Sequence, residues 1–371
     1  MTSPSAHLYD ASNVYVGDYS TIQDAVNAAG DGYKIQLDAG AYAGAIDING
    51  KALTITGANA GADPSTWAPG NITTIDRVAT DSSLTIDGVK VVETVQGAGF
   101  VNGGSWEAIG FVGGASDTLT VKNSIVTIDA STTPVEPQGF GFNITYDTGS
   151  ITIDHVQVTA FHGGFDDPTV SNYGAWINGS SDPGRAITIT NSSFDPGVSR
   201  SIGIAFDGQI GGPQIQIHDN AFGAVGTAPG AIRVFDFADP AALTGPVDFS
   251  GIANNTFADH AGNTGLEVNQ TDLDGTGHGV SVAFGGGTYA GGEVVQSVQD
   301  AGDSEFAVTL TGTTGRDILT GSAHDDSLSG GDGSDLLIGN GGADTMDGGQ
   351  GNDTYYADSA DTLVESVSGA A

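Results

Sequence analysis

The sequence predicts an all-β protein in which a long stack of coils is followed by a shorter roll of tight turns. Two observations predict this fold class. A loose template of apolar residues recurs along most of the chain, and a nine-residue register of glycine and aspartate fills its C-terminal end. A third pattern, near the N-terminus, predicts one short helix.

The helix is expected shortly after residue 20. Ser20 places a hydroxyl at the N-cap and Gln23 follows three positions later, which together make a capping box. Apolar residues at helical spacing then lead to Gly30, which ends the pattern. These residues are Ile22, Ala25, Val26 and Ala29.

Short segments that alternate apolar and polar residues follow the helix, as half-buried strands do. The first of them are residues 33–37, 45–48, 53–55 and 84–86. A template with apolar residues at positions 1, 3 and 8 then recurs. Its members are Leu119/Val121/Val126, Ile151/Ile153/Val158, Ile187/Ile189/Phe194, Ile215/Ile217/Phe222 and, in part, Ile252/Phe257. The second apolar positions are 32, 36, 28 and 35 residues apart, a spacing typical of solenoid coils.

Four asparagines fall near the same turn of successive coils: Asn123, Asn191, Asn220 and Asn255. Stacked asparagines that satisfy buried backbone groups are the favoured interpretation, and a binding role is the alternative.

The C-terminal end carries five glycines nine residues apart, each followed five places later by an aspartate. The glycines are Gly312, Gly321, Gly330, Gly339 and Gly348, and the aspartates are Asp317, Asp326, Asp335, Asp344 and Asp353. Glycines allow turns with positive φ that expose backbone carbonyls, while aspartates supply hard anionic oxygens. Calcium takes about six to eight such oxygens, so two stacked turns must share each ion.

The last three residues of each repeat read as a short strand with one inward apolar side chain. These side chains are Leu319, Leu328, Leu337, Met346 and Tyr355. If successive repeats alternate sides, repeats one, three and five stack on one edge, and repeats two and four on the other. About three enclosed calcium ions are then expected, with weaker terminal sites.

These repeats resemble the RTX nonapeptide, a calcium-binding parallel β-structure. The resemblance implies ligands from the glycine and aspartate positions, and repeat two matches least well because His324 replaces the fourth-position glycine. A flexible linker would explain the composition but not the nine-residue phase. The candidate metal residues are Gly312, Gly315, Asp317, Gly321, Asp326, Gly330, Gly331, Asp332, Gly333, Asp335, Gly339, Gly341, Gly342, Asp344, Gly348, Gly349, Gly351 and Asp353.

The charge balance favours cations as partners. The chain has 9 Lys+Arg against 45 Asp+Glu, a net charge of −36, which repels nucleic acid and anionic membranes. Residues 312–371 carry eleven of these acids and one arginine. Self-repulsion should keep this tail open without divalent ions, so that calcium binding is coupled to folding.

The chain has no cysteine, no N-terminal signal-peptide pattern and no 18-residue apolar run, which alone would indicate the cytoplasm. The RTX resemblance implies the opposite, type I secretion from a Gram-negative cell through an uncleaved C-terminal signal. The stretch from Asp353 to Glu365 looks like the usual close of such a chain. A pore-forming toxin is disfavoured because no segment is apolar enough to insert.

The N-terminal region resembles the start of right-handed parallel β-helix proteins of the pectin-lyase-like superfamily, on residues 15–26, 35–42 and 53–57. That resemblance covers residues 14 to about 300 and implies that the helix caps the open end of the stack. The expected fold is therefore a right-handed parallel β-helix with an N-terminal capping helix over residues 1–311. An RTX parallel β-roll with the secretion signal follows over residues 312–371.

A catalytic site is less clearly indicated. β-Helix enzymes that act on uronic-acid polymers need a charge neutraliser, a base and an acid. The Asp-Pro-His-Glu motif of mannuronan C5-epimerases is not found, and the Arg-x-Lys of polygalacturonases is absent although His162-Gly163 precedes Asp166-Asp167. The densest polar group comprises His155, His162, Asp166, Asp167, Tyr173 and Arg185, and its catalytic candidates are His162, Asp166, Asp167 and Arg185. A solvated loop is the favoured interpretation.

Two functional hypotheses follow. The first is a secreted, non-catalytic structural protein of a surface layer, matrix or adhesin, in which calcium drives folding and self-assembly or contact with a cell-surface polysaccharide. The second is an extracellular polysaccharide lyase, epimerase or glycoside hydrolase that uses the tail for secretion and folding.

Overall fold

A computed structural model describes most of the chain. The described residues are 4–94, 105–114, 116–129, 138–145, 149–161, 173–178, 186–195, 200–205, 214–223, 232–235, 247–249, 251–257, 266–269, 282–284, 287–289, 294–299, 307–312 and 316–365. They form 35 β-strands, one α-helix and one 3-10 helix, which confirms the all-β class. The chain divides into two compact units, residues 1–179 with 185–201 and residues 180–184 with 202–371.

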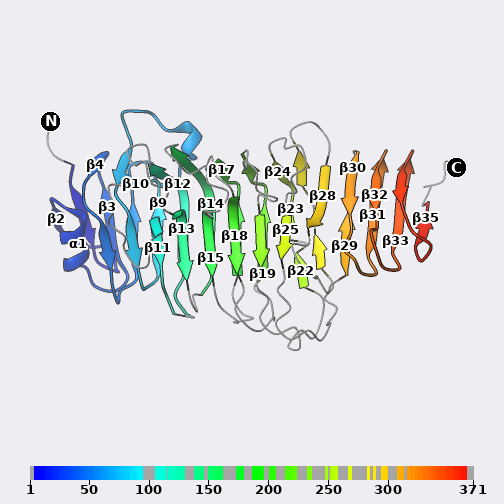
Figure 1. Cartoon of the computed structure of the whole chain (residues 1–371). Coiled ribbons are helices and arrows are strands. Elements are labelled where there is room, and N and C mark those ends of the chain that lie inside the picture. The colour runs from blue at the N-terminus through cyan, green and yellow to red at the C-terminus, as the bar shows by residue number, and fades with distance from the viewer. Residues whose placement is uncertain are drawn as a thin grey trace. The chain divides into compact units, whose positions relative to one another are not determined.

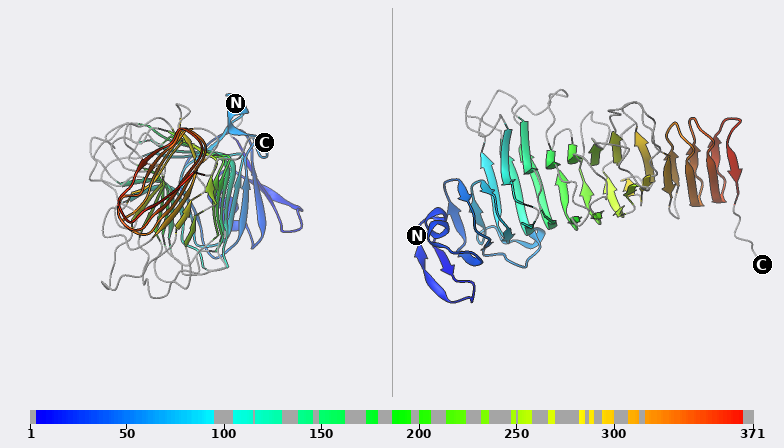
Figure 2. Two further views of the ribbon diagram at one scale, coloured as in Figure 1. Left: turned by 90° about the vertical axis from the view of Figure 1, so that its right-hand side faces the viewer. Right: turned by 90° about the horizontal axis from the view of Figure 1, so that it is seen from below.

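The first unit begins with a hairpin beside the helix (Figure 2). Strands β1 (Ala6–Tyr9) and β2 (Tyr15–Tyr19) pair antiparallel, and β1 also pairs antiparallel with β3 (Tyr33–Leu37). The helix α1 (Ile22–Ala28) contacts these strands through its apolar side, on which Ile22, Ala25 and Val26 are buried. The predicted amphipathic helix is therefore present.

The capping residue differs from the prediction by one position. The N-cap is Thr21, whose Oγ1 accepts the Asp24 N–H at 3.1 Å and donates to Asp24 Oδ2 at 2.7 Å. A carboxylate three residues after the cap also suits the positive end of a helix. The expected capping pair, Ser20 with Gln23, was wrong because Asp24 offers the better partner one residue later.

Gln23 has another role, since its side-chain amide pairs with the backbone of β5 (Ile46–Ile48) as a neighbouring strand would. Gln23 Nε2 donates to the Asp47 carbonyl at 3.1 Å, and the Asp47 N–H donates to Gln23 Oε1 at 2.9 Å. At the other end of the helix, Lys51 Nζ donates to the carbonyls of Val26 and Ala29 at 3.0 Å each. Both contacts fix the helix against the first coil.

Three parallel ladders continue the first unit (Figure 1). The first contains β3, β6 (Leu53–Thr56), β9 (Leu84–Asp87), β12 (Leu119–Asp129), β14 (Ile151–Phe161) and β16 (Ala186–Thr190). The second contains β4 (Gly40–Tyr42), β7 (Thr73–Ile75), β10 (Lys90–Thr94), the later parts of β12 and β14, and β17 (Ser193–Asp195). The third contains β5, β8 (Val78–Thr80), β11 (Ser105–Phe111), β13 (Gln138–Thr145) and β15 (Tyr173–Asn178). The 3-10 helix η1 (Pro64–Thr66) contacts β12 and β14.

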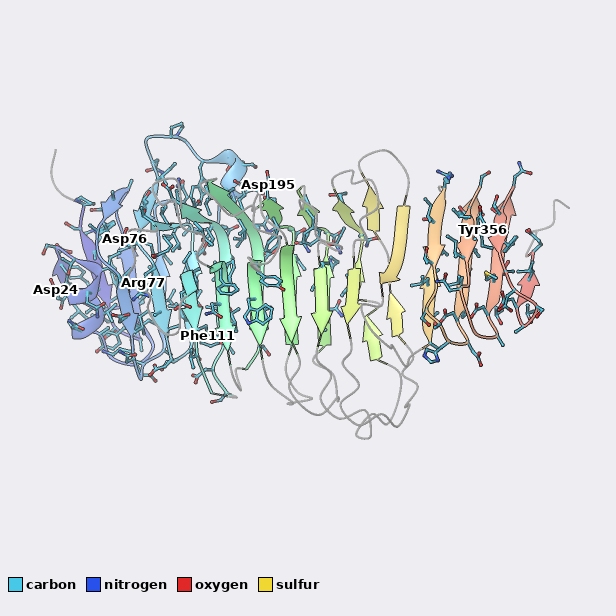
Figure 3. All side chains as sticks on the ribbon, viewed as in Figure 1. Asp24, Asp76, Arg77, Phe111, Asp195 and Tyr356 are labelled. Atoms are coloured by element: carbon cyan, nitrogen blue, oxygen red, sulfur yellow. The ribbon has the colours of Figure 1, made fainter. Side chains whose placement is uncertain are left out.

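The apolar template lies inside these coils, as predicted. Leu119 is opposite Ile151, which is opposite Ile187, and all three are buried. Phe111, from the third ladder, is also fully buried (Figure 3). Stacked apolar side chains of neighbouring coils therefore form the continuous core that a solenoid requires.

In successive coils, a bend between neighbouring strands, or within the long strands β12 and β14, contains a residue in the left-handed conformation. In the first unit these residues are Gly88 (φ 73°), Asn123 (φ 46°), His155 (φ 52°) and Asn191 (φ 50°), and in the second unit they are Asp219 (φ 59°) and Asn254 (φ 54°). Asparagine and aspartate tolerate this conformation better than most residues, which explains their recurrence at the turn.

The stacked asparagines divide into two kinds. Asn255 satisfies buried backbone as predicted, since its Oδ1 accepts the Asn220 N–H at 3.1 Å and its Nδ2 donates to the Ile217 carbonyl at 2.8 Å. The prediction was wrong for Asn123 and Asn191. They occupy the left-handed bend itself, and their amides donate to the carboxylates of Asp87 and Asp154, both at 2.9 Å.

The second unit also consists of parallel ladders. One contains β18 (Arg200–Ala205), β21 (Ile232–Phe235), β25 (Leu266–Asn269), β28 (Val294–Gln299), β30 (Asp317–Thr320), β32 (Leu336–Ile338) and β34 (Thr354–Tyr356). Another contains β22 (Val247–Phe249), β26 (Val282–Phe284), β29 (Val308–Thr311), β31 (Ser327–Gly333), β33 (Thr345–Gly351) and β35 (Thr362–Val364). Shorter pairings join β19 (Gln214–His218) to β23 (Ile252–Ala253), and β20 (Ala221–Phe222) to β24 (Asn255–Phe257). Strand β24 pairs in turn with β27 (Gly287–Tyr289).

The predicted domain boundary at residues 311 and 312 lies inside the second unit. Strand β28 pairs with β30, and β29 pairs with β31, so both ladders cross this point without interruption. In a parallel stack each strand pairs with the strands of the coils before and after it, whatever the length of the repeat. Strand pairing therefore does not mark the point where the repeat length changes. The boundary therefore remains a prediction from the sequence.

Candidate metal centre

The five nonapeptide repeats form the C-terminal end of the second unit, in two alternating columns (Figure 1). Strands β30, β32 and β34 follow the aspartates of repeats one, three and five, and β31 and β33 follow those of repeats two and four. The inward side chains Leu319, Leu328, Leu337 and Met346 are buried, whereas Tyr355 on the last repeat is half-buried. The alternation predicted from the sequence is thus present.

The repeat aspartates are joined in two ladders of their own. The backbone N–H of Asp317 donates to Asp335 Oδ1 at 2.8 Å, and that of Asp335 donates to Asp353 Oδ1 at 2.8 Å. In the other column the N–H of Asp326 donates to Asp344 Oδ1 at 2.8 Å. One oxygen of each accepting carboxylate therefore holds the backbone of the turn two repeats earlier.

The second carboxylate oxygen is left without a protein partner in three repeats. The Oδ2 atoms of Asp335, Asp344 and Asp353 are buried and make no hydrogen bond within the described part of the chain. Each lies over the first glycine of its own repeat, where a Cβ would collide with it. These glycines are Gly330, Gly339 and Gly348. A buried, unbonded carboxylate oxygen is costly, and a hard cation would satisfy it.

The raised pKa values of two of these carboxylates also favour a bound cation. Burial, together with the charges of Asp317 and Asp353, raises the pKa of Asp335 from 3.8 to about 6, against the opposing effect of the hydrogen bond from the Asp317 N–H. Burial and the charges of Asp326 and Asp361 raise the pKa of Asp344 to about 6. Stacked carboxylates thus destabilise one another's charged forms, and a divalent cation between turns would relieve this repulsion.

The loops before these aspartates have the backbone that exposes carbonyl oxygens. Left-handed or related conformations occur at the second and fourth positions of repeats three to five: Gly331 (φ 101°), Gly333 (φ 152°), Asn340 (φ 70°), Gly342 (φ 115°), Gly349 (φ 86°) and Gly351 (φ 136°). At Gly349 and Gly351 the backbone of the turn two repeats earlier also lies too close for a Cβ. Glycine is therefore required for conformation and for close stacking.

Repeat two is built differently, as its weaker match indicated. Ser322 occupies the second position, and both its N–H and its hydroxyl donate to the Asp326 carboxylate, at 2.6 Å and 2.9 Å. Neither Ser322 nor His324 has a positive φ. In this turn both carboxylate oxygens of Asp326 accept hydrogen bonds from Ser322, and the role of Asp326 as a metal residue stays a prediction.

The remaining predicted metal residues are placed as follows. Gly312 begins repeat one and a Cβ there would meet the Gly330 carbonyl and Asp317 Oδ2, while Gly315 lies outside the described residues. Asp332 is exposed and its Oδ1 accepts Gln350 Nε2 at 2.7 Å, so its side chain points away from the aspartate ladder. Gly321 matches the first-position glycines, and a Cβ on Gly341 would meet only ordinary contacts.

A sixth turn follows repeat five, and the sequence analysis missed it. Asp361 Oδ1 accepts the Asp344 N–H at 3.1 Å, its Oδ2 accepts the Asp358 N–H at 2.6 Å, and β35 follows at once. Tyr355 ties this turn to the roll, because its hydroxyl accepts the Gly348 N–H at 2.7 Å and donates to Glu365 at 3.0 Å. Asp361 stands 17 rather than 18 residues after Asp344, so a strict nine-residue register passes over it.

Calcium fits these residues. In repeats three to five, a carboxylate oxygen without a partner lies beside a glycine turn with exposed carbonyls, and calcium prefers such oxygens. No group of three or more His, Cys, Asp or Glu suited to a metal occurs in the described part of the chain. Calcium takes about six to eight oxygens, so an ion in this roll would need backbone carbonyls in addition to one carboxylate per turn.

The tail matches the RTX calcium-binding nonapeptide repeat. The family model, described as four copies of the repeat, matches residues 309–337, 321–355 and 329–362. These RTX repeats bind Ca2+, so the chain is a calcium-binding protein. No curated protein and no solved structure matches the chain.

The catalytic candidates of the body fall in segments that the structure does not describe. His162, Asp166, Asp167 and Arg185 lie outside the described residues, so their role remains a prediction. Of their expected neighbours, His155 Nδ1 lies 3.0 Å from Asp154 Oδ2, and Tyr173 is buried against the rings of Phe140 and Trp176. Tyr173 therefore has a packing role.

Proposed function

We propose that the chain is a secreted, non-catalytic structural protein whose RTX roll folds on calcium and thereby completes a right-handed parallel β-helix body over residues 1–311. The supporting observation is the set of buried Oδ2 atoms of Asp335, Asp344 and Asp353, which have no hydrogen-bond partner within the described residues. Such a roll is stable only when cations complete it. The proposed role is that of a surface-layer, matrix or adhesive component that leaves the cell by type I secretion with residues 312–371.

Calcium titration of the full chain tests the proposal. Circular dichroism and calorimetry are expected to show gained β-structure and heat of binding for about three ions. Asp335→Asn should lower the apparent calcium affinity at least about tenfold, which is 1.4 kcal/mol. Asp332→Asn is the matched control, because its carboxylate already bonds Gln350. Equal affinities for the two variants would contradict the assignment.

The structural role has a separate test. With about millimolar calcium, within the range of extracellular calcium sites, the protein should form ordered assemblies or bind a cell-surface polysaccharide, and chelator should reverse this. A monomer at every calcium concentration that binds no glycan would contradict the role without affecting calcium binding. The described residues include no helix with the length and apolar content to cross a membrane.

A further inference from the structure

His7 is held between two carboxylates from different parts of the first unit. His7 lies on β1, and its Nδ1 is 2.5 Å from Asp18 Oδ1 on β2. Its Nε2 is 3.3 Å from Asp38 Oδ1, on the segment between β3 and β4. The ring therefore joins the N-terminal hairpin to the first coil.

The charge state of His7 follows from this geometry. A carboxylate can only accept a hydrogen bond, whereas a neutral imidazole has one N–H and one lone pair. Both contacts are hydrogen bonds only when both ring nitrogens carry protons, that is, in the imidazolium form. Loss of one proton leaves a lone pair facing Asp18 or Asp38.

The groups around His7 favour the imidazolium form. Asp38 is held in turn by the backbone, because its Oδ2 accepts the Ser5 N–H at 3.2 Å. On β3 the residue opposite His7 is Gln36, which is uncharged. The bond with Asp18 and, after a smaller opposing effect of burial, the bond with Asp38 raise the pKa of His7 above 6.5.

The β1–β2 hairpin lies at a sheet edge. β1 covers the outer edge of β3, and among the registers of the described strands β2 pairs with β1. An uncovered sheet edge presents unpaired N–H and carbonyl groups to other chains. We propose that protonated His7 is a pH-sensitive latch that holds the β1–β2 hairpin over the edge of β3.

The contribution of His7 to stability depends on pH. Because folding raises the pKa of His7, its stabilising contribution is complete below about pH 6.5, the unfolded value. The contribution is lost as pH rises through the higher folded value. The latch is therefore closed in mildly acidic solution and weakened in alkaline solution.

Hydrogen exchange of the full chain in calcium tests the latch. After correction for intrinsic exchange rates, protection of residues 5–19 and 33–37 is expected to fall about threefold to tenfold between pH 5.5 and 8.5, because His7 is a partly exposed ion pair. His7→Gln, which keeps one donor but no charge, should abolish the pH dependence. His218→Gln is the matched control, because its ring pairs with the adjacent Asp219 in the second unit and its loss should leave the hairpin unchanged.

A second measurement covers the case in which His7→Gln fails to fold. NMR titration should place the His7 pKa above 6.5 in the wild type and lower in Asp18→Asn, with the loss of hairpin protection moving to lower pH in parallel. A His7 pKa at or below 6.5, or a hairpin equally protected at both pH values, would overturn the proposal.

Discussion

At the scale of single residues, the calcium roll depends on atoms that are placed with no protein partner. Asp335 uses Oδ1 to hold the Asp317 N–H and leaves Oδ2 unbonded over Gly330. The same division of roles recurs at Asp353. One carboxylate therefore builds the turn and also offers an oxygen to an ion, which explains why the aspartate and the glycine keep a fixed distance in sequence.

The first prediction concerns the glycine beneath the aspartate. In Gly330→Ala the new Cβ would meet Asp335 Oδ2 and the Gly348 carbonyl, so the turn must shift. We expect a loss of calcium affinity of at least about tenfold and a lower calcium-dependent melting temperature, by a strain on the order of 1–3 kcal/mol. Calorimetric titration measures the first effect and scanning calorimetry the second.

A matched control lies in the next repeat. In Gly341→Ala the Cβ comes no closer than 3.8 Å to the nearest atom, so this variant should bind calcium like the wild type. If both alanine variants behave alike, the close approach at Gly330 has no role in the site.

The second prediction concerns Glu93, a buried carboxyl group on β10. It is 7% exposed, and burial raises its pKa to about 7, against the opposing charge of Arg77. The charges of Glu107 and of Asp76, beside Arg77 (Figure 3), contribute to this rise. Because the folded pKa is above the unfolded value of 4.5, the ionised form opposes folding, and this penalty grows from about pH 4.5 to about pH 7.

Glu93→Gln should therefore flatten the pH dependence of stability in the first unit. At pH 8 the expected gain in the free energy of unfolding is on the order of 2 kcal/mol, from the size of the pKa shift. Denaturant titrations at pH 5 and pH 8 measure it, with Asp195→Asn, an exposed residue of the same unit, as the control. A wild type whose stability rises between these pH values relative to Glu93→Gln would refute the assignment.

At the scale of elements, periodicity was predictable and local bonding was not. The nine-residue phase gave the alternation of the roll strands, and the apolar template gave the buried residues of β12, β14 and β16. Competition between equivalent groups could not be resolved from the sequence. Thr21 rather than Ser20 caps the helix, and Asp361 begins a sixth turn one residue out of register.

The hydrogen-bond partners of some site residues could not be predicted from the sequence pattern, because they depend on contacts that form only in the folded chain. In the sequence, Ser322 and His324 indicate only that the second and fourth positions of repeat two lack glycine. The structure shows that Ser322 donates two hydrogen bonds to the Asp326 carboxylate. In the same way, asparagine at the coil bend is recognisable, but the choice between a backbone partner for Asn255 and a carboxylate partner for Asn123 depends on the neighbouring coil. The hydrogen-bond partner of each asparagine is therefore set by the residues that the neighbouring coil places against it.

The third prediction tests how the helix closes the first unit. Gln23→Ala removes two hydrogen bonds to the Asp47 backbone and exposes a strand edge. We expect a loss of stability on the order of 1–2 kcal/mol and faster amide exchange in β5. Asn27→Ala is the control on the same helix, because Asn27 accepts a hydrogen bond from the Gln23 side chain and, within the described residues, bonds no backbone group of β5. Equal exchange of β5 in the two variants would mean that the helix does not depend on this contact.

At the scale of the whole molecule, the two compact units differ in what stabilises them. The described coils of the first unit are closed by apolar stacking and by the α1 contacts, whereas the second unit ends in the calcium roll. Within the second unit, β28 and β29 pair directly with the roll strands β30 and β31. Each strand of a parallel stack depends on its neighbours, so the loss of the roll should be transmitted along these ladders.

The last prediction is therefore that chelation of calcium unfolds the second unit progressively and spares the first. Without the ion, repulsion among the stacked carboxylates and the unbonded oxygens of Asp335, Asp344 and Asp353 destabilises the roll. Hydrogen exchange with EGTA should show residues 316–365 unprotected, partial loss in β28 and β29, and unchanged protection in β6, β9 and β12. Magnesium should restore little, because it keeps its waters and demands octahedral geometry. Loss of protection in all ladders at once would show a single cooperative molecule, and unchanged protection of the roll would show that the ion is not part of its fold.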